Sequence, residues 1–348
     1  MDMFYIGFRD PLFSIIIFFT IIFIITFFSY WWGRYKRKED SRYLDKFLEQ
    51  FRALPTENEL KVLISSGELS EKSWLLLAAS YSKNGDYEKS IEIYNEILNV
   101  ANTTRAKETM FLLGKTYFKA GFLERSRQIF LEILKHSPRT PQALHYLLLV
   151  YEYMRDYKSA LDVLEPLEEL DEDIKLDKTY LHALSLLNDT KIQDKEKAQK
   201  LLALYKERGV LAHLVFEYIF RIDPQLAWKN LDLEKCEILS EILYGLESKN
   251  LNLDIISKSQ YLKDLYSARG DISLCTQSSI FEFDVLIKLN GSSNATLSFE
   301  YICSKCKGSY PFAFNRCSSC HVIDTAVLEY SLSRDYAKEF REENNSFQ

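Results

Sequence analysis

The pattern of hydrophobic and polar residues divides the chain into a short, wholly apolar run and a long amphipathic remainder. Residues 12–32, with the sequence LFSIIIFFTIIFIITFFSYWW, contain no charged side chain. A helix of this length spans roughly 30 Å, which is the thickness of the hydrocarbon core of a bilayer. The run therefore predicts a transmembrane helix, and the aromatic residues Tyr30, Trp31 and Trp32 at its end are typical of a membrane interface.

A cleaved signal peptide and a buried core helix are the alternatives for this run. A signal peptide has a basic start and a shorter apolar stretch, whereas this chain begins with MDMFYIGFRD. Basic residues concentrate behind the run, with Arg9 before it and Arg34, Lys36, Arg37 and Lys38 after it. Because such residues remain in the cytoplasm, we expect residues 1–11 to be extracytoplasmic and the bulk of the chain, from about residue 33, to be cytoplasmic.

Apolar, small and aromatic residues recur at a nearly constant interval in the middle of the chain. The segments SWLLLAASYSKNGDYEKSIEIYNEIL, TMFLLGKTYFKAGFLERSRQIFLEIL and ALHYLLLVYEYMRDYKSALDVLEPLE align with offsets of 36 and 34 residues. This pattern resembles the tetratricopeptide repeat, a pair of helices that stacks on its neighbours. A generic helical bundle, the alternative, would not hold this register. The aligned positions include Leu77, Leu113 and Leu147, then Tyr81, Tyr117 and Tyr151, then Ser90, Ser126 and Ala160.

These patterns predict a mostly α-helical protein with several successive parts. Behind the transmembrane helix we expect a juxtamembrane helical segment at 33–70 and a repeat solenoid at 71–270, clearest at about 71–170. A strand pair with a small metal module is predicted at 271–335, followed by a tail at 336–348. Small side chains at positions such as Gly114 and Ser126 are expected to let paired helices approach closely.

A repeat solenoid presents a concave groove lined mainly by the first helix of each pair. The register of the repeat directs one set of side chains toward that groove, although some of them would pack against neighbouring helices instead. The partner-binding residues predicted in this way are Phe111, Lys115, Phe118, His145 and Glu152.

Four of the six cysteines form two Cys-x-x-Cys pairs near the C-terminus: Cys303 and Cys306, then Cys317 and Cys320. Two residues between cysteines allow both sulfur atoms to reach one ion, and two such turns complete a tetrahedral site. Cytoplasmic thiols stay reduced, so we favour a metal ion over two disulfides or a small thiol core. Zinc is the first choice and iron the second, in a structural site with all positions filled by protein. The intervening YPFAF is expected to form a strand that shields the ion, and Gly308 to supply a backbone turn with positive φ.

Other functional signals are sparse. The chain carries 50 acidic and 44 basic residues, a net charge of −6, which argues against a nucleic-acid-binding surface. No nucleophile elbow, dinucleotide-binding fingerprint or His-Glu-x-x-His motif occurs. We therefore predict a protein that is not an enzyme.

The order of these parts, together with YICSKCKGSYPFAFNRCSSC, resembles the lipopolysaccharide assembly protein B family of Gram-negative bacteria. The resemblance implies a rubredoxin-like metal module with the four cysteines as its ligands. It also implies an adaptor in the inner membrane that limits lipopolysaccharide synthesis. Such an adaptor promotes the degradation of the LpxC deacetylase by the FtsH protease.

Two other functions remain open at this point. The chain could be a membrane-tethered scaffold that organises envelope or lipopolysaccharide biosynthetic enzymes without delivering any of them to a protease. Less favoured is an electron carrier with iron at the four cysteines.

Overall fold

The computed structural model describes residue 18 and residues 20–28, 57–66, 70–100, 106–289 and 294–334. These residues belong to two compact units, Met1–Asp156 and Tyr157–Gln348. Within the predicted transmembrane segment, the described residues are helical and exposed. Among the helices that the structure describes, none is long and apolar enough to cross a membrane. The predicted extracytoplasmic segment, most of the juxtamembrane segment and the C-terminal tail lie outside the described residues.

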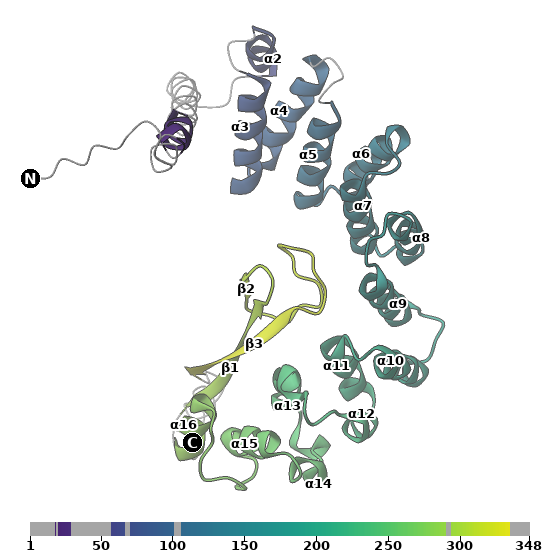
Figure 1. Ribbon diagram of the computed structural model, residues 1–348. Coiled ribbons are helices and arrows are strands. Elements are labelled where there is room, and N and C mark those ends of the chain that lie inside the picture. Colours follow the sequence, from purple (N-terminus) through teal and green to yellow (C-terminus); the bar gives the residue numbers. More distant parts are fainter. Residues whose placement is uncertain are drawn as a thin grey trace, which may run out of the picture. The chain divides into compact units, whose positions relative to one another are not determined.

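The first unit contains antiparallel helix pairs, as the repeated pattern predicts. Figure 1 shows α3, α4 and α5 side by side, and each of them contacts the other two. The large side chains of Trp74, Ile93, Tyr94 and Phe130 are fully buried in this unit. Its helices are α2 (Glu57–Ser66), α3 (Glu71–Asn84), α4 (Tyr87–Val100), α5 (Ala106–Lys119), α6 (Leu123–His136) and α7 (Pro141–Tyr153).

Small residues bring the two helices of the first two pairs together. The Ser90 hydroxyl donates to the carbonyl of Ala78 at 2.8 Å, and one repeat later the Ser126 hydroxyl donates to the carbonyl of Gly114 at the same distance. A Cβ atom at Gly114 would lie 3.0 Å from ring carbons of Phe130. The close approach predicted for these positions therefore has two sources, a buried hydrogen bond and the absence of a side chain.

The turn inside each pair needs one residue in the left-handed region. Gly85 and Gly121 occupy it in the first two repeats, with φ of 89° and 80°. Arg155 occupies the same place after α7, with φ of 60°. Glycine adopts this conformation without steric penalty and other residues do not. The turn after α7 therefore has the same geometry, but arginine adopts its left-handed conformation less favourably than glycine does.

The second unit continues with helices and then changes character. The helical elements between α12 and α15 are shorter than those before them (Figure 1). The indole of Trp228 is buried and donates to the carbonyl of Asn250 at 2.8 Å. The elements are α8 (Tyr157–Glu168), α9 (Lys175–Asn188), α10 (Asp194–Arg208), α11 (Ala212–Ile222), α12 (Pro224–Asn230), η1 (Cys236–Leu239), α13 (Ser240–Tyr244), η2 (Ser248–Asn250), α14 (Leu253–Ile256), α15 (Gln260–Arg269) and α16 (Phe281–Leu289).

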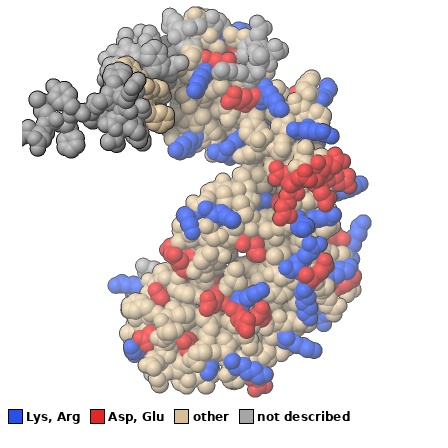
Figure 2. Space-filling model, viewed as in Figure 1, with Lys and Arg blue, Asp and Glu red and all other residues tan. Residues whose placement is uncertain are grey.

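Acidic side chains gather near the end of α8. Figure 2 shows this patch in red. Its residues are all exposed: Glu165, Glu168, Glu169, Asp171, Glu172 and Asp173. This arrangement agrees with a solvated helix end and loop.

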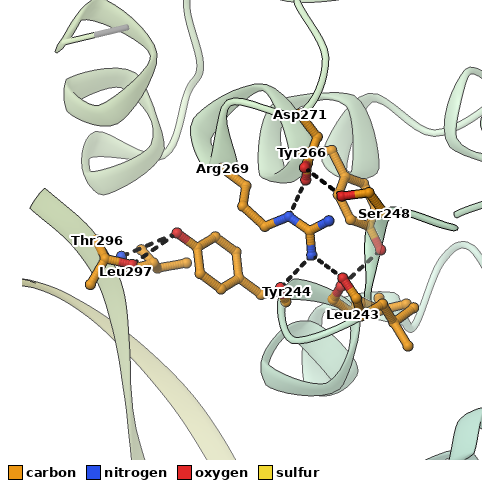
Figure 3. Close-up of polar contacts among 9 residues, drawn as sticks. Leu243, Tyr244, Ser248, Tyr266, Arg269, Asp271, Thr296 and Leu297 are labelled. Carbon is orange, nitrogen blue, oxygen red and sulfur yellow. Dashed lines mark hydrogen bonds and ion pairs between the residues drawn. The ribbon is translucent and has the colours of Figure 1, made fainter. Parts of the chain in front are cut away.

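A half-buried arginine, Arg269, holds short helices of the second unit together. Figure 3 shows the Arg269 guanidinium bonded to the carboxylate of Asp271 and to the backbone carbonyl of Tyr244, and it also donates to the carbonyl of Leu246. The phenol of Tyr244 lies 3.1 Å from the hydroxyl of Thr296 on the first strand. Tyr244, the last residue of α13, therefore contacts both Arg269 and the sheet.

A three-stranded antiparallel sheet of order β2-β1-β3 completes the second unit, with β1 (Ala295–Cys303), β2 (Ser309–Tyr310) and β3 (Ala326–Arg334). The strand pair predicted ahead of the cysteines is wrong in its first half, because FEFDVLIKL forms α16. Its alternating apolar residues suggested a strand. Phe283 and Leu286 are instead buried on one helical face, and Asp284 pairs with Lys288 one turn later at 2.6 Å.

Candidate metal centre

The structure brings the four predicted cysteines together at one end of the sheet. The Sγ atoms of Cys303, Cys306, Cys317 and Cys320 all lie within 4.8 Å of one another. The nearest contacts cross between the two motifs, at 3.6 Å from Cys303 to Cys320 and from Cys306 to Cys317. Cys303 ends β1, whereas Cys317 and Cys320 lie in the loop between β2 and β3.

The two Cys-x-x-Cys turns have the same backbone structure. In the first, the amide of Cys303 donates to the carbonyl of Gly308 at 2.9 Å, and the amide of Lys307 donates to the carbonyl of Cys303 at 2.9 Å. In the second, the equivalent bonds run from Cys317 to Val322 at 3.0 Å and from His321 to Cys317 at 2.8 Å. The cluster is therefore made of two matching turns that face each other.

Each turn closes with a residue in the left-handed region. These residues are Lys307 and His321, with φ of 60° and 61°. The prediction that Gly308 supplies a positive φ is wrong by one position. Gly308 instead allows a close approach of Tyr310, because a Cβ atom there would lie 3.0 Å from the hydroxyl and 3.3 Å from the ring of Tyr310.

The matching turns give the cysteines two different environments. Cys303 and Cys317 are completely buried, whereas Cys306 is exposed and Cys320 is half-buried. Burial raises the pKa of the Cys303 thiol, but the backbone amides of Cys306 and Lys305 and the Thr325 hydroxyl outweigh it and lower the pKa to about 6. The pKa of Cys317 is also lowered. Burial raises it, and this is outweighed mainly by the Tyr310 hydroxyl and two backbone amides.

The more exposed cysteine of each turn has its pKa shifted in the opposite direction. The backbone amide of Gly308 favours the Cys306 thiolate, but burial and the neighbouring thiols outweigh it, so the pKa of Cys306 is raised. Burial and the other thiols raise the pKa of Cys320 to about 12. The thiols raise one another's pKa because neighbouring thiolates repel each other. A cation among the four sulfur atoms would offset this repulsion, so that all four cysteines could lose their protons.

The donor set fits a tetrahedral thiophilic ion. Four cysteine sulfur atoms, backbone amides directed at them and two closed turns are the features of structural zinc and of mononuclear iron sites. Among the described residues, this is the one group of His, Cys, Asp or Glu side chains close enough to hold a metal ion. The strand expected from YPFAF is limited to its first residue, Tyr310. Phe312 is 77% exposed, so it does not shield the cluster.

The second Cys-x-x-Cys turn is attached to the helices of its unit by a buried arginine. Arg316 directly precedes Cys317, and its guanidinium pairs with the carboxylate of Asp177 on α9 at 2.8 Å. It also lies 5.3 Å from the ring centre of Tyr180 and donates to the carbonyl of His321 at 2.8 Å. The turn and helix α9 are thus held by a single side chain, which sequence analysis did not single out.

Further contacts join the same region to α11 and α13. The carboxylate of Asp324 accepts from the backbone amide of Leu211, just before α11, at 3.2 Å. The phenol of Tyr301 on β1 donates to the carboxylate of Glu241 on α13. Loop residues and a strand therefore meet three different helices. Such pairings are separated by too many residues to be read from the sequence.

The predicted partner-binding residues lie in the first unit with different degrees of exposure. Phe111 and Phe118 belong to an aromatic cluster with Phe130, Tyr146 and Tyr153, in which neighbouring ring centres lie 5.2–5.9 Å apart. The ammonium group of Lys115 lies 5.7 Å from the ring centre of Tyr146. His145 is half-buried and Glu152 is buried, with 9% of it exposed. Their role in binding stays a prediction, and Tyr146 and Tyr153 are neighbours that the register did not select.

Comparison with known proteins agrees with the repeat architecture. Residues 71–104 match the family model of the tetratricopeptide repeat. The chain is similar to MamA from Desulfovibrio magneticus, with 17% identity and a TM-score of 0.36, covering 46% of this chain and 89% of that one. It is also similar to a tetratricopeptide repeat protein from Parabacteroides merdae, with 17% identity and a TM-score of 0.39, covering 73% and 96%. No curated protein matches the chain.

These structural similarities are too distant to indicate what the chain binds. The chain nevertheless contains a tetratricopeptide repeat at residues 71–104 and, near its C-terminus, a four-cysteine cluster that is suited to a metal ion.

Proposed function

We propose that the chain is a membrane-anchored adaptor that limits lipopolysaccharide synthesis by promoting FtsH-dependent degradation of the LpxC deacetylase. The observation that supports an adaptor is the repeat unit, since stacked helix pairs serve to present surfaces to other proteins. The apolar run at residues 12–32 would hold the chain in the bacterial inner membrane beside the protease. The finer assignment rests on the resemblance in the order of parts.

The aromatic cluster on α5 and α7 is the surface proposed to bind a protein partner. Phe111, Phe118 and Tyr146 are half-buried, and Tyr153 is 53% exposed. Aromatic side chains supply much contact area for little conformational entropy and are enriched among residues that dominate binding energy. Lys115, beside Tyr146, adds a positive charge for an acidic group of the partner.

The metal module is proposed to be structural. All four ligand positions would come from cysteine, which leaves no open position for a substrate. When bound, zinc or iron would fix the two Cys-x-x-Cys turns, and through Arg316 and Asp324 the turns would hold α9 and the start of α11. Zinc is the proposed ion, with iron as the alternative.

Affinity capture of the full-length chain from its own membrane tests the proposal. We expect FtsH and LpxC among the co-purifying proteins, and a longer LpxC half-life in cells that lack the chain. The double variant Lys115→Glu/Tyr153→Ala should lose both partners. The matched control is Phe122→Ala, which removes an aromatic residue of the same unit with 51% exposure outside the cluster.

Two results would overturn this function. An unchanged LpxC half-life would exclude the adaptor role. Capture of envelope-synthesis enzymes without the protease would identify a scaffold instead.

A further inference from the structure

Two hydroxyl groups lie against the sulfur cluster in addition to the backbone amides. The Thr325 hydroxyl is 3.3 Å from the Sγ atom of Cys303, and the Tyr310 hydroxyl is 3.2 Å from the Sγ atom of Cys317. Each hydroxyl therefore contacts the first and fully buried cysteine of one Cys-x-x-Cys turn. Among the described contacts, neither Cys306 nor Cys320 has a hydroxyl partner.

Neighbouring residues hold the Tyr310 hydroxyl in place. The ring packs edge-on against Phe314, with 4.9 Å between ring centres, and its other side lies against Gly308, where a Cβ atom would be 3.0 Å from the hydroxyl. The hydroxyl also donates to the Oγ atom of Ser319 at 2.7 Å. Ser319 is exposed and can bond water instead, and a charged thiolate is a stronger acceptor than a neutral hydroxyl, so a metal-bound Cys317 would compete for the Tyr310 proton.

Thr325 is fixed in place at the first Cys-x-x-Cys turn. It is 7% exposed, and its backbone carbonyl accepts from the amide of Ser304 at 2.8 Å, inside the first Cys-x-x-Cys turn. Its hydroxyl therefore faces Cys303 because its backbone is bonded to the same turn. Tyr310 is the last residue of β2, and Thr325 directly precedes β3.

We propose that Tyr310 and Thr325 are positioning residues of the metal centre, each donating an O–H···S hydrogen bond to the inner thiolate of one turn. This inference rests on the proposed binding of a metal ion. A metal-bound thiolate has no proton and acts as an acceptor, so both hydroxyls must donate. Their bonds withdraw negative charge from Cys303 and Cys317, which stabilises the ligands in the charged form that a metal requires.

Cobalt(II) substitution of the full-length chain tests this proposal by spectroscopy. A hydrogen bond to a thiolate lowers the energy of its lone pairs, so its removal makes transfer of an electron to the metal easier. We expect the sulfur-to-cobalt charge-transfer band to move to lower energy in Tyr310→Phe and in Thr325→Val. Thr325→Ser keeps a hydroxyl and should restore the wild-type band.

Zinc competition with a chelator provides the second measurement. Loss of a group that bonds a metal ligand typically weakens metal affinity about tenfold or more, and we expect about tenfold for each hydroxyl. The matched control is Tyr266→Phe, which removes a buried phenol that bonds the carbonyl of Leu243 at 2.9 Å away from the cysteines. It should leave the band and the affinity unchanged.

The outcomes separate this inference from metal binding itself. If the wild-type chain gives no cobalt-thiolate band, both metal binding and the hydroxyl roles are overturned. A normal wild-type band that stays in place in Tyr310→Phe and Thr325→Val overturns the hydroxyl roles alone. Ser319→Ala should leave the band in place; if only this variant shifts it, the Tyr310 proton belongs to Ser319 and the role of Tyr310 is refuted.

Discussion

Replacement of Arg316 by methionine should destabilise the second unit far more than loss of an ordinary surface ion pair. Only 8% of the Arg316 side chain is exposed, and its guanidinium bonds Asp177 and the carbonyl of His321, each at 2.8 Å. Methionine keeps much of the volume of the side chain but removes the charge and both hydrogen bonds. It also removes the contact with the Tyr180 ring.

The expected loss in the free energy of unfolding follows from how far Asp177, the partner of Arg316, is exposed. Breaking a fully buried ion pair costs about 3–5 kcal/mol because it leaves an uncompensated charge. The Asp177 side chain is 23% exposed and can regain water. Hydrogen bonds to charged groups contribute about 1.5–3 kcal/mol. We therefore expect a loss of about 2–3 kcal/mol in the free energy of unfolding.

Arg127→Met is the matched control. Its guanidinium pairs with Glu124 at 2.6 Å, which is at least as close as the Arg316 pair, but the two side chains are 33% and 51% exposed. Exposed pairs contribute about 0.2–1 kcal/mol. Arg127→Met therefore gives the cost of losing an exposed pair of similar distance, against which the loss of the buried Arg316 contacts is compared.

The assay is denaturant unfolding of the zinc-loaded full-length chain in detergent, followed by tryptophan fluorescence and circular dichroism. A double-mutant cycle with Asp177→Asn should give a coupling energy of about 1 kcal/mol or more, since the two groups are in contact. The reasoning would be refuted if Arg316→Met were no more destabilising than Arg127→Met, or if the coupling energy were zero.

Three further outcomes are expected. Gly114→Ala should destabilise the first unit by about 1–3 kcal/mol in thermal unfolding, because the new methyl group meets the ring of Phe130. Alanine has the higher helix propensity, so a stabilised variant would contradict this packing. Arg155→Gly should raise the stability by about 0.5–1 kcal/mol by relieving the left-handed conformation, and no gain would show that the turn is unstrained. Burial lowers the pKa of His213 in the folded chain, and nearby carboxylates offset this only in part. The folded chain therefore resists protonation of His213, and the free energy of unfolding should fall as the pH drops below about 6.5, the pKa of histidine in an unfolded chain. His213→Gln should flatten this dependence between pH 7.5 and 5.5.

The sequence predicted the features that depend on local periodicity. Repeated spacing of Leu77, Leu113 and their neighbours implied helix pairs, and the spacing of the cysteines implied one cluster. The strand prediction for FEFDVLIKL failed because alternation and helical periodicity overlap in a short apolar segment. There the acidic first turn and the pairing of Asp284 with Lys288 favoured a helix.

Contacts between distant segments could not be predicted in this way. The pairing of Arg316 with Asp177 joins residues 139 positions apart, and that of Asp324 with the amide of Leu211 joins residues 113 positions apart. No local pattern marks these partners, because each is an ordinary residue in its own segment. The role of Tyr310 was equally hidden, since a tyrosine within a predicted strand suggests packing and not a bond to sulfur.

The two Cys-x-x-Cys turns match in backbone but differ in what else they hold. The first turn is followed by exposed residues, including Lys307 and Phe312. The second has Arg316 immediately before it and Asp324 shortly after it, and these side chains bond α9 and the start of α11. An ion at the four sulfur atoms would fix both turns relative to each other, and through the second turn it would fix two helices of the unit. A structural metal therefore fits this position better than a carrier of electrons, because its removal would release contacts well beyond its own ligands.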